Sequence, residues 1–180
     1  MAGALLELLA AFTSVGIAVS LYPVLQTASP GLAIGSVVFR AIESVMYIAA
    51  VVELLSLLTL GQQLARADGV ERTVLLAVGA SVLGAREHAT VAGVFAFNIG
   101  AFMYYAVFFR TLLIPRWLSA WGLAAIVPML AACVLALFSD TPVTGHKLLA
   151  LPIAVQEIAL ALWLIVKGFR ARALALGSVP

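Results

Sequence analysis

The sequence predicts an all-α fold, an integral membrane helix bundle with about five transmembrane helices plus one short interfacial or re-entrant helix. Composition is the first reason, because 64% of the 180 residues are hydrophobic and only 10% are charged, unlike soluble domains. Length is the second reason, since several apolar stretches reach the roughly 20 residues that a helix needs to cross hydrocarbon. Short turns separate these stretches, so residues 1–180 are expected to form a single domain.

The charge and cysteine content of the chain argue against several kinds of binding partner and binding site. The net charge is +2 and the basic residues are scattered, so no nucleic acid partner is expected. Cys133 is the single cysteine, which excludes an intramolecular disulfide and a paired-thiol metal site. No cofactor is predicted. The expected partner is the lipid bilayer, with the chain crossing the cell (inner) membrane several times.

The first two spans are predicted over residues 3–26 and 32–60. The start of the chain has no basic region, so a cleaved signal peptide is not expected. Residues 27–31 are typical of a turn, and Pro30 suits the first position of the following helix. The second span organises the rest of the bundle, because it carries charged residues inside an otherwise apolar stretch.

Residues 72–112 are too long for a single crossing. As one helix they would measure ~60 Å, about twice the hydrocarbon thickness. A charged triplet at 86–88 divides them, so we predict a short interfacial or re-entrant helix over 72–85 and a third span over 89–112. Small residues recur along this span and permit close helix packing; they are Ala89, Gly93, Ala96 and Gly100.

The last two spans are predicted over residues 117–138 and 147–169, followed by a loose tail over 170–180. Basic residues near the helix ends favour a cytoplasmic C-terminus. The residues assigned to that side are Arg110, Arg116, Lys167, Arg170 and Arg172, and those assigned to the opposite side are Arg66, Arg72, Arg86 and Lys147.

A charge cluster is predicted near the midplane of the bilayer. At ~100° per residue, Arg40, Glu43 and Tyr47 share one stripe of the second span. Each charge in hydrocarbon costs roughly 2.5–3.5 kcal/mol, so such residues normally face a partner or a wet cavity. Glu157 of the last span lies at similar depth, within reach of Arg40. Further polar residues at suitable depth are Gln156, Asn98, Tyr104 and Tyr105.

A second cluster is expected nearer to the outer face, formed by Glu7, Glu53, Arg86, Glu87 and His88. Carboxylates and a histidine can bind a metal or transfer protons. However, the sequence contains no two-ligand helical spacing such as HxxxH. A plain interfacial charge cluster is therefore favoured, and no metal is predicted.

Several segments together resemble a bacterial multi-pass membrane family that is catalogued only as a domain of unknown function. The segments are Leu21–Leu25, Phe39–Glu43, Leu113–Leu123, Leu151–Glu157 and Trp163–Phe169. The resemblance implies an all-helical membrane bundle and, by itself, no activity. Members of that family usually carry one more N-terminal helix, so one helix of the family is expected to be missing here.

The function expected from these observations is non-enzymatic. Catalytic signatures such as GxSxG, HExxH and a phosphate-binding glycine loop are absent, and serines such as Ser14 are interpreted as packing hydroxyls. We expect binding of a lipid-like or small ligand, or of a partner membrane subunit or second copy, around Arg40. The cluster can equally be a structural clamp between spans. The alternatives are a small transporter or proton-coupled carrier and a membrane-embedded enzyme using Glu43 or Glu157.

Overall fold

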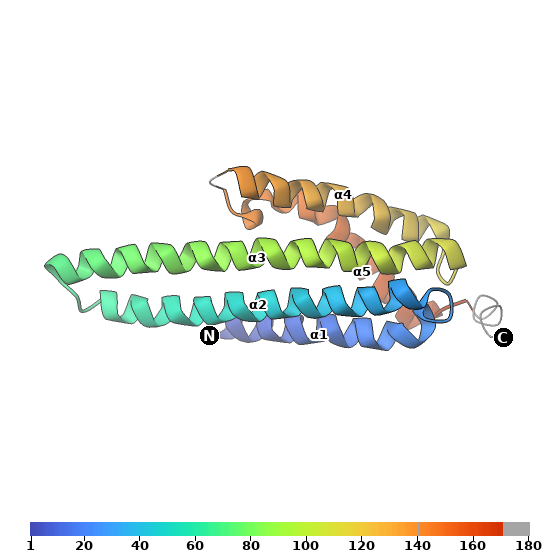
Figure 1. The fold of residues 1–180 in the computed structure, drawn as a ribbon, viewed down its shortest axis with the longest axis horizontal. Coiled ribbons are helices and arrows are strands. Elements are labelled where there is room, and N and C mark those ends of the chain that lie inside the picture. Colours follow the sequence, from blue (N-terminus) through green and yellow to red (C-terminus); the bar gives the residue numbers. More distant parts are fainter. Residues whose placement is uncertain (140, 171–180) are drawn as a thin grey trace.

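The computed structural model describes residues 1–139 and 141–170 (Figure 1). Across these residues the chain forms five long α-helices and one short 3-10 helix, with no strand. The elements are α1 Ala2–Leu25, α2 Pro30–Leu64, α3 Gly69–Thr111, α4 Arg116–Phe138, η1 Val143–His146 and α5 Lys147–Lys167. The loose tail predicted over 170–180 lies outside the described residues except for Arg170, whose backbone N–H donates to the Leu113 carbonyl at 3.0 Å.

The five long helices confirm the predicted all-α membrane bundle. Each is apolar and long enough to cross a membrane, judged by length and composition. Pro30 begins α2, as predicted, because its fixed φ and missing N–H are tolerated in the first helical turn. Leu112 ends α3 in the left-handed conformation, with φ 60°, and the chain then turns into α4.

The separate helix predicted over 72–85 is wrong, because these residues belong to the continuous 43-residue helix α3. The triplet at 86–88 does not interrupt the helix, since Arg and Glu are good helix formers and no proline intervenes. A break would also leave backbone N–H and C=O groups without partners at two new helix ends. A straight α3 measures ~65 Å, so it extends beyond a hydrocarbon layer of ~30 Å or tilts strongly within it.

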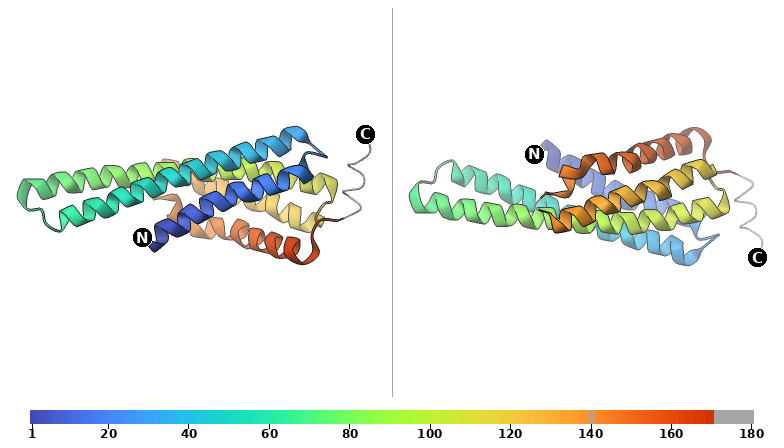
Figure 2. Two further views of the ribbon diagram at one scale, coloured as in Figure 1. Left: turned by 90° about the horizontal axis from the view of Figure 1, so that it is seen from below. Right: turned by 90° about the horizontal axis from the view of Figure 1, so that it is seen from above.

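Successive helices pack against each other in chain order, from α1 on α2 to α4 on α5. Figure 1 shows that the α2–α3 hairpin continues well beyond the start of α1 and the end of α4. In Figure 2, α1 and α5 run along the same side of the molecule. These two helices, the first and the last, flank the candidate site described below.

Helix α3 is the centre of the packing. In its most apolar stretch 67% of the residues are buried, against 17% in α1 and in the α5 region. Two of the predicted small residues lie where α2 approaches closely: a Cβ added at Gly93 would lie 3.1 Å from Tyr47 Cε1, and one at Gly100 would lie 3.3 Å from Phe39 Cβ. These glycines allow α2 and α3 to pack closely.

Candidate functional site

Arg40 lies at the centre of a buried hydrogen-bond network. Its Nη1 donates to Glu43 Oε2 at 3.0 Å and to Ser14 Oγ at 3.3 Å. Its Nη2 donates to Glu157 Oε1 at 3.0 Å and to the Tyr104 hydroxyl at 2.9 Å. One guanidinium therefore connects α1, α2, α3 and α5.

The partners of Arg40 also bond to one another. The Ser14 hydroxyl donates to Glu43 Oε2 at 3.0 Å, and the Tyr104 hydroxyl donates to Glu157 Oε1 at 3.1 Å. The Phe97 ring lies under the guanidinium, with its centroid 4.5 Å from Arg40 Cζ, a cation–π geometry. Each carboxylate thus accepts a second hydrogen bond, which partly compensates for its removal from water.

Helix geometry explains how the sequence brings these side chains together. Glu43 follows Arg40 by three residues, so both lie on the same face of α2. Phe97 and Tyr104 are seven residues apart and share one face of α3. The face of α2 with the charges therefore packs against an aromatic face of α3, and Arg40 bonds to both carboxylates that its depth predicted.

Burial differs sharply between the two acidic residues. The side chains of Arg40 and Glu43 are 9% and 5% exposed, whereas the side chain of Glu157 is 37% exposed. Glu157 is therefore the charged member of the network that a molecule outside the bundle can reach. With all three groups ionised the network carries one excess negative charge.

The network opens into a cleft of about 620 Å³ between α1 and α5. Its polar wall includes Arg40, Glu43 and Glu157, and its apolar wall comes mainly from α1 and α5. The apolar residues lining the cleft include Ile17, Leu21, Ile153, Leu160, Leu164 and Ile165. The arrangement can hold a molecule with a polar end at Arg40 and an apolar body along the helices.

Gln156, Asn98 and Tyr105 are predicted for this network but form hydrogen bonds elsewhere. Gln156 is fully buried and donates to the Leu118 carbonyl at 3.1 Å while accepting from the Tyr105 hydroxyl. It therefore joins α3, α4 and α5 in a separate set of hydrogen bonds. Asn98 donates to Val94 of its own helix at 2.7 Å, and its buried Oδ1 has no partner among the described residues. None of the three hydrogen-bonds to Arg40, because each is engaged with other partners.

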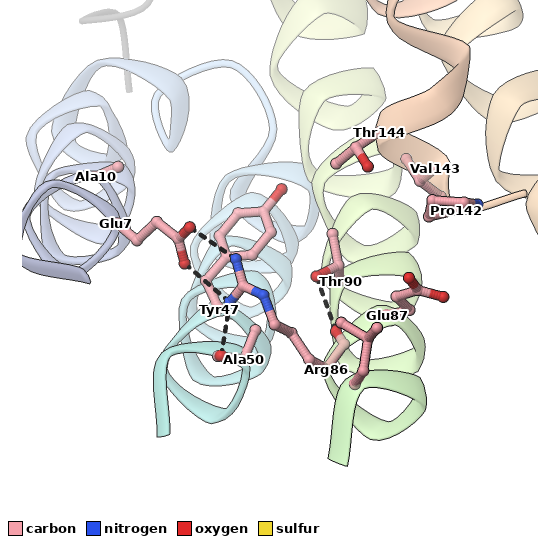
Figure 3. A pocket seen from close by; sticks show the side chains of 11 residues that line it. Glu7, Ala10, Tyr47, Ala50, Arg86, Glu87, Thr90, Pro142, Val143 and Thr144 are labelled. Carbon is pink, nitrogen blue, oxygen red and sulfur yellow. Dashed lines mark hydrogen bonds and ion pairs between the residues drawn. The ribbon is translucent and has the colours of Figure 1, made fainter. Parts of the chain in front are cut away.

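The outer cluster is centred on an ion pair between α1 and α3. Figure 3 shows Glu7 and Arg86 pointing toward each other; Arg86 Nη2 donates to Glu7 Oε1 at 2.8 Å, and Nη1 donates to the Ala50 carbonyl at 2.7 Å. This group lines a second cavity of about 430 Å³ together with Glu87 and Tyr47. Tyr47, predicted for the Arg40 network, lines both cavities but forms no hydrogen bond within residues 1–139 and 141–170.

The remaining residues of the outer cluster are not part of this group. His88 faces a third cavity of about 350 Å³, beside Glu87 and Ser139. Glu53 lines none of the three cavities and has no ion pair in the described part of the chain. In the same part no group of three or more His, Cys, Asp or Glu side chains is close enough to hold a metal ion.

One known protein family matches most of the chain. A family model described as "Domain of unknown function (DUF4386)" matches residues 1–168. The chain belongs to the DUF4386 family. This confirms the resemblance noted in the sequence, and the matched residues of this DUF4386 protein include the whole Arg40 network. Comparisons with curated proteins and with solved structures found no match.

Sequence reasoning missed two members of the network in this DUF4386 protein. From the sequence, Ser14 is interpreted as a packing hydroxyl, and Phe97 is assigned to neither predicted cluster. Nothing in the sequence distinguishes Ser14 from the other serines of the spans, because its contact with Glu43 depends on how α1 is placed. The spacing of Phe97 and Tyr104 on one face of α3 is the signal that could have identified the aromatic side of the site.

Proposed function

We propose that this DUF4386 protein binds an amphipathic, lipid-like molecule in the cleft between α1 and α5, with its polar head at the Arg40 network. The observation that carries this proposal is the position of the ion network: it forms a polar patch in the wall of a cleft whose lining is otherwise mostly apolar. A membrane ligand with one polar end matches that distribution. No catalytic step is needed to account for it.

The dimensions and lining of the cleft support this proposal. Its volume of about 620 Å³ lies within the ~300–1,000 Å³ common for small-molecule sites. α1 and α5 are not joined by extensive packing in the described residues, so a chain can enter sideways from the bilayer. The exposed apolar side chains of Ile17 and Ile165 continue the apolar surface of the cleft toward lipid.

The exposure of Glu157 argues against a purely structural clamp. A carboxylate that only holds helices together needs no access to a cleft, whereas one that binds a ligand does. The side chain of Glu43 is 5% exposed, but that of Glu157, which lines the cleft, is 37% exposed. Glu157 is held in place by Arg40 and Tyr104 while part of its carboxylate remains accessible from the cleft.

Photo-crosslinking tests the proposal. The probe is a long-chain alcohol with a diazirine on its chain, added to protein in phosphatidylcholine nanodiscs. We expect crosslinks on α1 and α5 residues of the cleft, such as Ile17 and Leu164, and several-fold fewer in Ala161→Trp, which fills the cleft. Leu162→Trp is the matched control, because Leu162 is exposed on α5 but does not line the cleft. Equal labelling of both variants would contradict the proposal.

A proton-coupled carrier is a second candidate, and one observation favours it. Ala10 and Tyr47 line both the Arg40 cleft and the outer cavity, so the two cavities are neighbours separated by these residues. A path from the outer charges to Glu43 and Glu157 would suit proton access. Proteoliposomes with an internal pH dye test this: acidification that Glu157→Gln abolishes would support a carrier, and an unchanged internal pH with every amphiphile added would reject it.

A further inference from the structure

We infer that the cleft selects a cationic amphiphile whose head group is a primary ammonium hydrogen-bonded to Glu157. This inference rests on the proposed function, because it assigns the head group of the same ligand. It follows from the charge balance of the network, from the donors that Arg40 has already used, and from the carboxylate oxygen that remains free.

Charge balance is the first argument. Among the residues lining the cleft, Arg40 is basic while Glu43 and Glu157 are acidic. An uncompensated negative charge is unfavourable in apolar surroundings. A ligand that brings one positive charge neutralises the site, whereas an anionic ligand would raise the excess to two negative charges.

The donors of Arg40 are the second argument. An anionic head group would need the guanidinium, but Nη1 already donates to Glu43 and Ser14, and Nη2 donates to Glu157 and Tyr104. Two of these partners are carboxylates, and charge-assisted bonds to carboxylates are stronger than neutral hydrogen bonds. An anion that binds either terminal nitrogen would have to displace a partner already in place, which leaves it the single N–H of Nε beside two carboxylates. The arrangement therefore disfavours an anionic head group.

The free oxygen of Glu157 is the third argument. Oε1 accepts from both Arg40 and Tyr104, while Oε2 accepts no hydrogen bond from the described residues. An ionised carboxylate only accepts hydrogen bonds, and an ammonium group only donates them. The hydroxyl of Tyr47 on the same cleft wall offers a second acceptor. A primary ammonium, with three N–H donors, matches these acceptors.

Competition between head groups tests the inference in the wild-type protein. Dodecylamine, dodecanol and dodecanoate share one chain length, and each is added against the photoreactive alcohol in phosphatidylcholine nanodiscs. We expect dodecylamine to displace the probe at a concentration about tenfold lower than dodecanol does. This is the affinity difference expected when a charge-assisted hydrogen bond replaces a neutral one. Dodecanoate should be the weakest competitor.

Two variants separate recognition by Glu157 from unequal partitioning into the bilayer. Glu157→Gln removes the excess charge and should bring dodecylamine and dodecanol to similar potency. Glu53→Gln is the matched control, because Glu53 is an acid of α2 that lies outside the cleft, and it should keep the preference for the amine. Partitioning is the same in all nanodiscs, so the change between variants reports the site alone.

The outcomes distinguish the inference from the proposed function. If the probe crosslinks to the cleft but dodecanol competes as well as dodecylamine, the ammonium assignment is wrong and amphiphile binding stands. The same conclusion follows if dodecanoate is the most potent competitor. The same holds if Glu157→Gln keeps the amine preference. Crosslinks spread outside the cleft, insensitive to every competitor, would overturn both.

Discussion

Arg40 shows how a single charged residue is stabilised inside an apolar bundle. Its guanidinium bonds to carboxylates on two helices and to hydroxyls on two others, and it stacks over Phe97. The same contacts make the residue essential to the packing, because an unpaired charge left in the interior is far less favourable than a neutral polar group.

Removing Arg40 alone should therefore destabilise the protein strongly. For Arg40→Met we expect a loss of about 3–5 kcal/mol in the free energy of unfolding, since Glu43 and Glu157 lose their partner. The triple variant Arg40→Met, Glu43→Gln and Glu157→Gln should be much milder, because no charge remains unpaired. Denaturant unfolding in mixed micelles measures both. A single variant as stable as the wild type would show that the network does not hold the bundle together.

At the scale of helices, α3 and α4 pack through Gly122 and the Tyr105 ring. A Cβ built at Gly122 would lie 2.6 Å from Tyr105 Cε1. Tyr105 is fully buried and its hydroxyl donates to Gln156, so the ring has little room to move. The glycine thus sets the distance between the two helices.

Replacing Gly122 by alanine should lower the stability of the protein, whereas the same replacement at a glycine with open space around it should not. Gly122→Ala should destabilise the protein by about 1–3 kcal/mol through overpacking. Gly16→Ala in α1, where an added Cβ meets nothing within 4 Å, should be neutral or stabilising by up to ~1 kcal/mol from helix propensity. Thermal unfolding of the two variants side by side measures the difference. Equal effects would contradict the close packing of α4 on Tyr105.

The continuity of α3 is open to a direct distance measurement. Val74 and Phe102 are exposed near the two ends of α3, and a straight helix separates them by ~42 Å. Spin labels at these positions in a Cys133→Ala background should give that distance by pulsed electron resonance. A markedly shorter distance would mean that the helix bends at 86–88, as the sequence alone led us to expect.

For the whole molecule, crossing of the membrane by all five long helices of the described residues would place the start of α1 and the end of α5 on opposite sides. From Arg110, Arg116 and Lys167 near helix ends, we predict that the end of α5 is cytoplasmic. Arg86, by contrast, is held by Glu7 and the Ala50 carbonyl, so it contributes to packing as well as to the charge bias.

Cysteine labelling tests this orientation. Single cysteines at Thr144, before α5, and at Ser178, after it, are placed in a Cys133→Ala background. We expect a membrane-impermeant maleimide to label Thr144→Cys in intact spheroplasts and Ser178→Cys only in inverted vesicles, because α5 crosses the bilayer between them. Labelling of both from one side would rule out the crossing by α5.

The class of the fold and the three charged members of the Arg40 network, Arg40, Glu43 and Glu157, can be predicted from sequence pattern alone. Apolar stretches of sufficient length leave a helix bundle as the solution that satisfies the backbone in lipid. Arg40 and Glu43 are three residues apart, and residues at this spacing are neighbours on the surface of any α-helix. Their proximity therefore follows from the sequence once the segment is predicted to be helical. The position of Glu157 along its span can also be estimated from the sequence, because the rise per residue of an α-helix is constant.

Which helix faces pack against each other cannot be predicted in this way and is seen only in the folded chain. Gln156 and Asn98 are predicted for the Arg40 network from their positions along the spans, yet Gln156 bonds to Tyr105 and the amide of Asn98 bonds to its own helix backbone. Ser14 joins the network through the placement of α1 on α2. Arg86 likewise pairs with Glu7 of a distant helix, α1. Such contacts arise from packing between segments far apart in the chain, which periodicity within one segment does not encode.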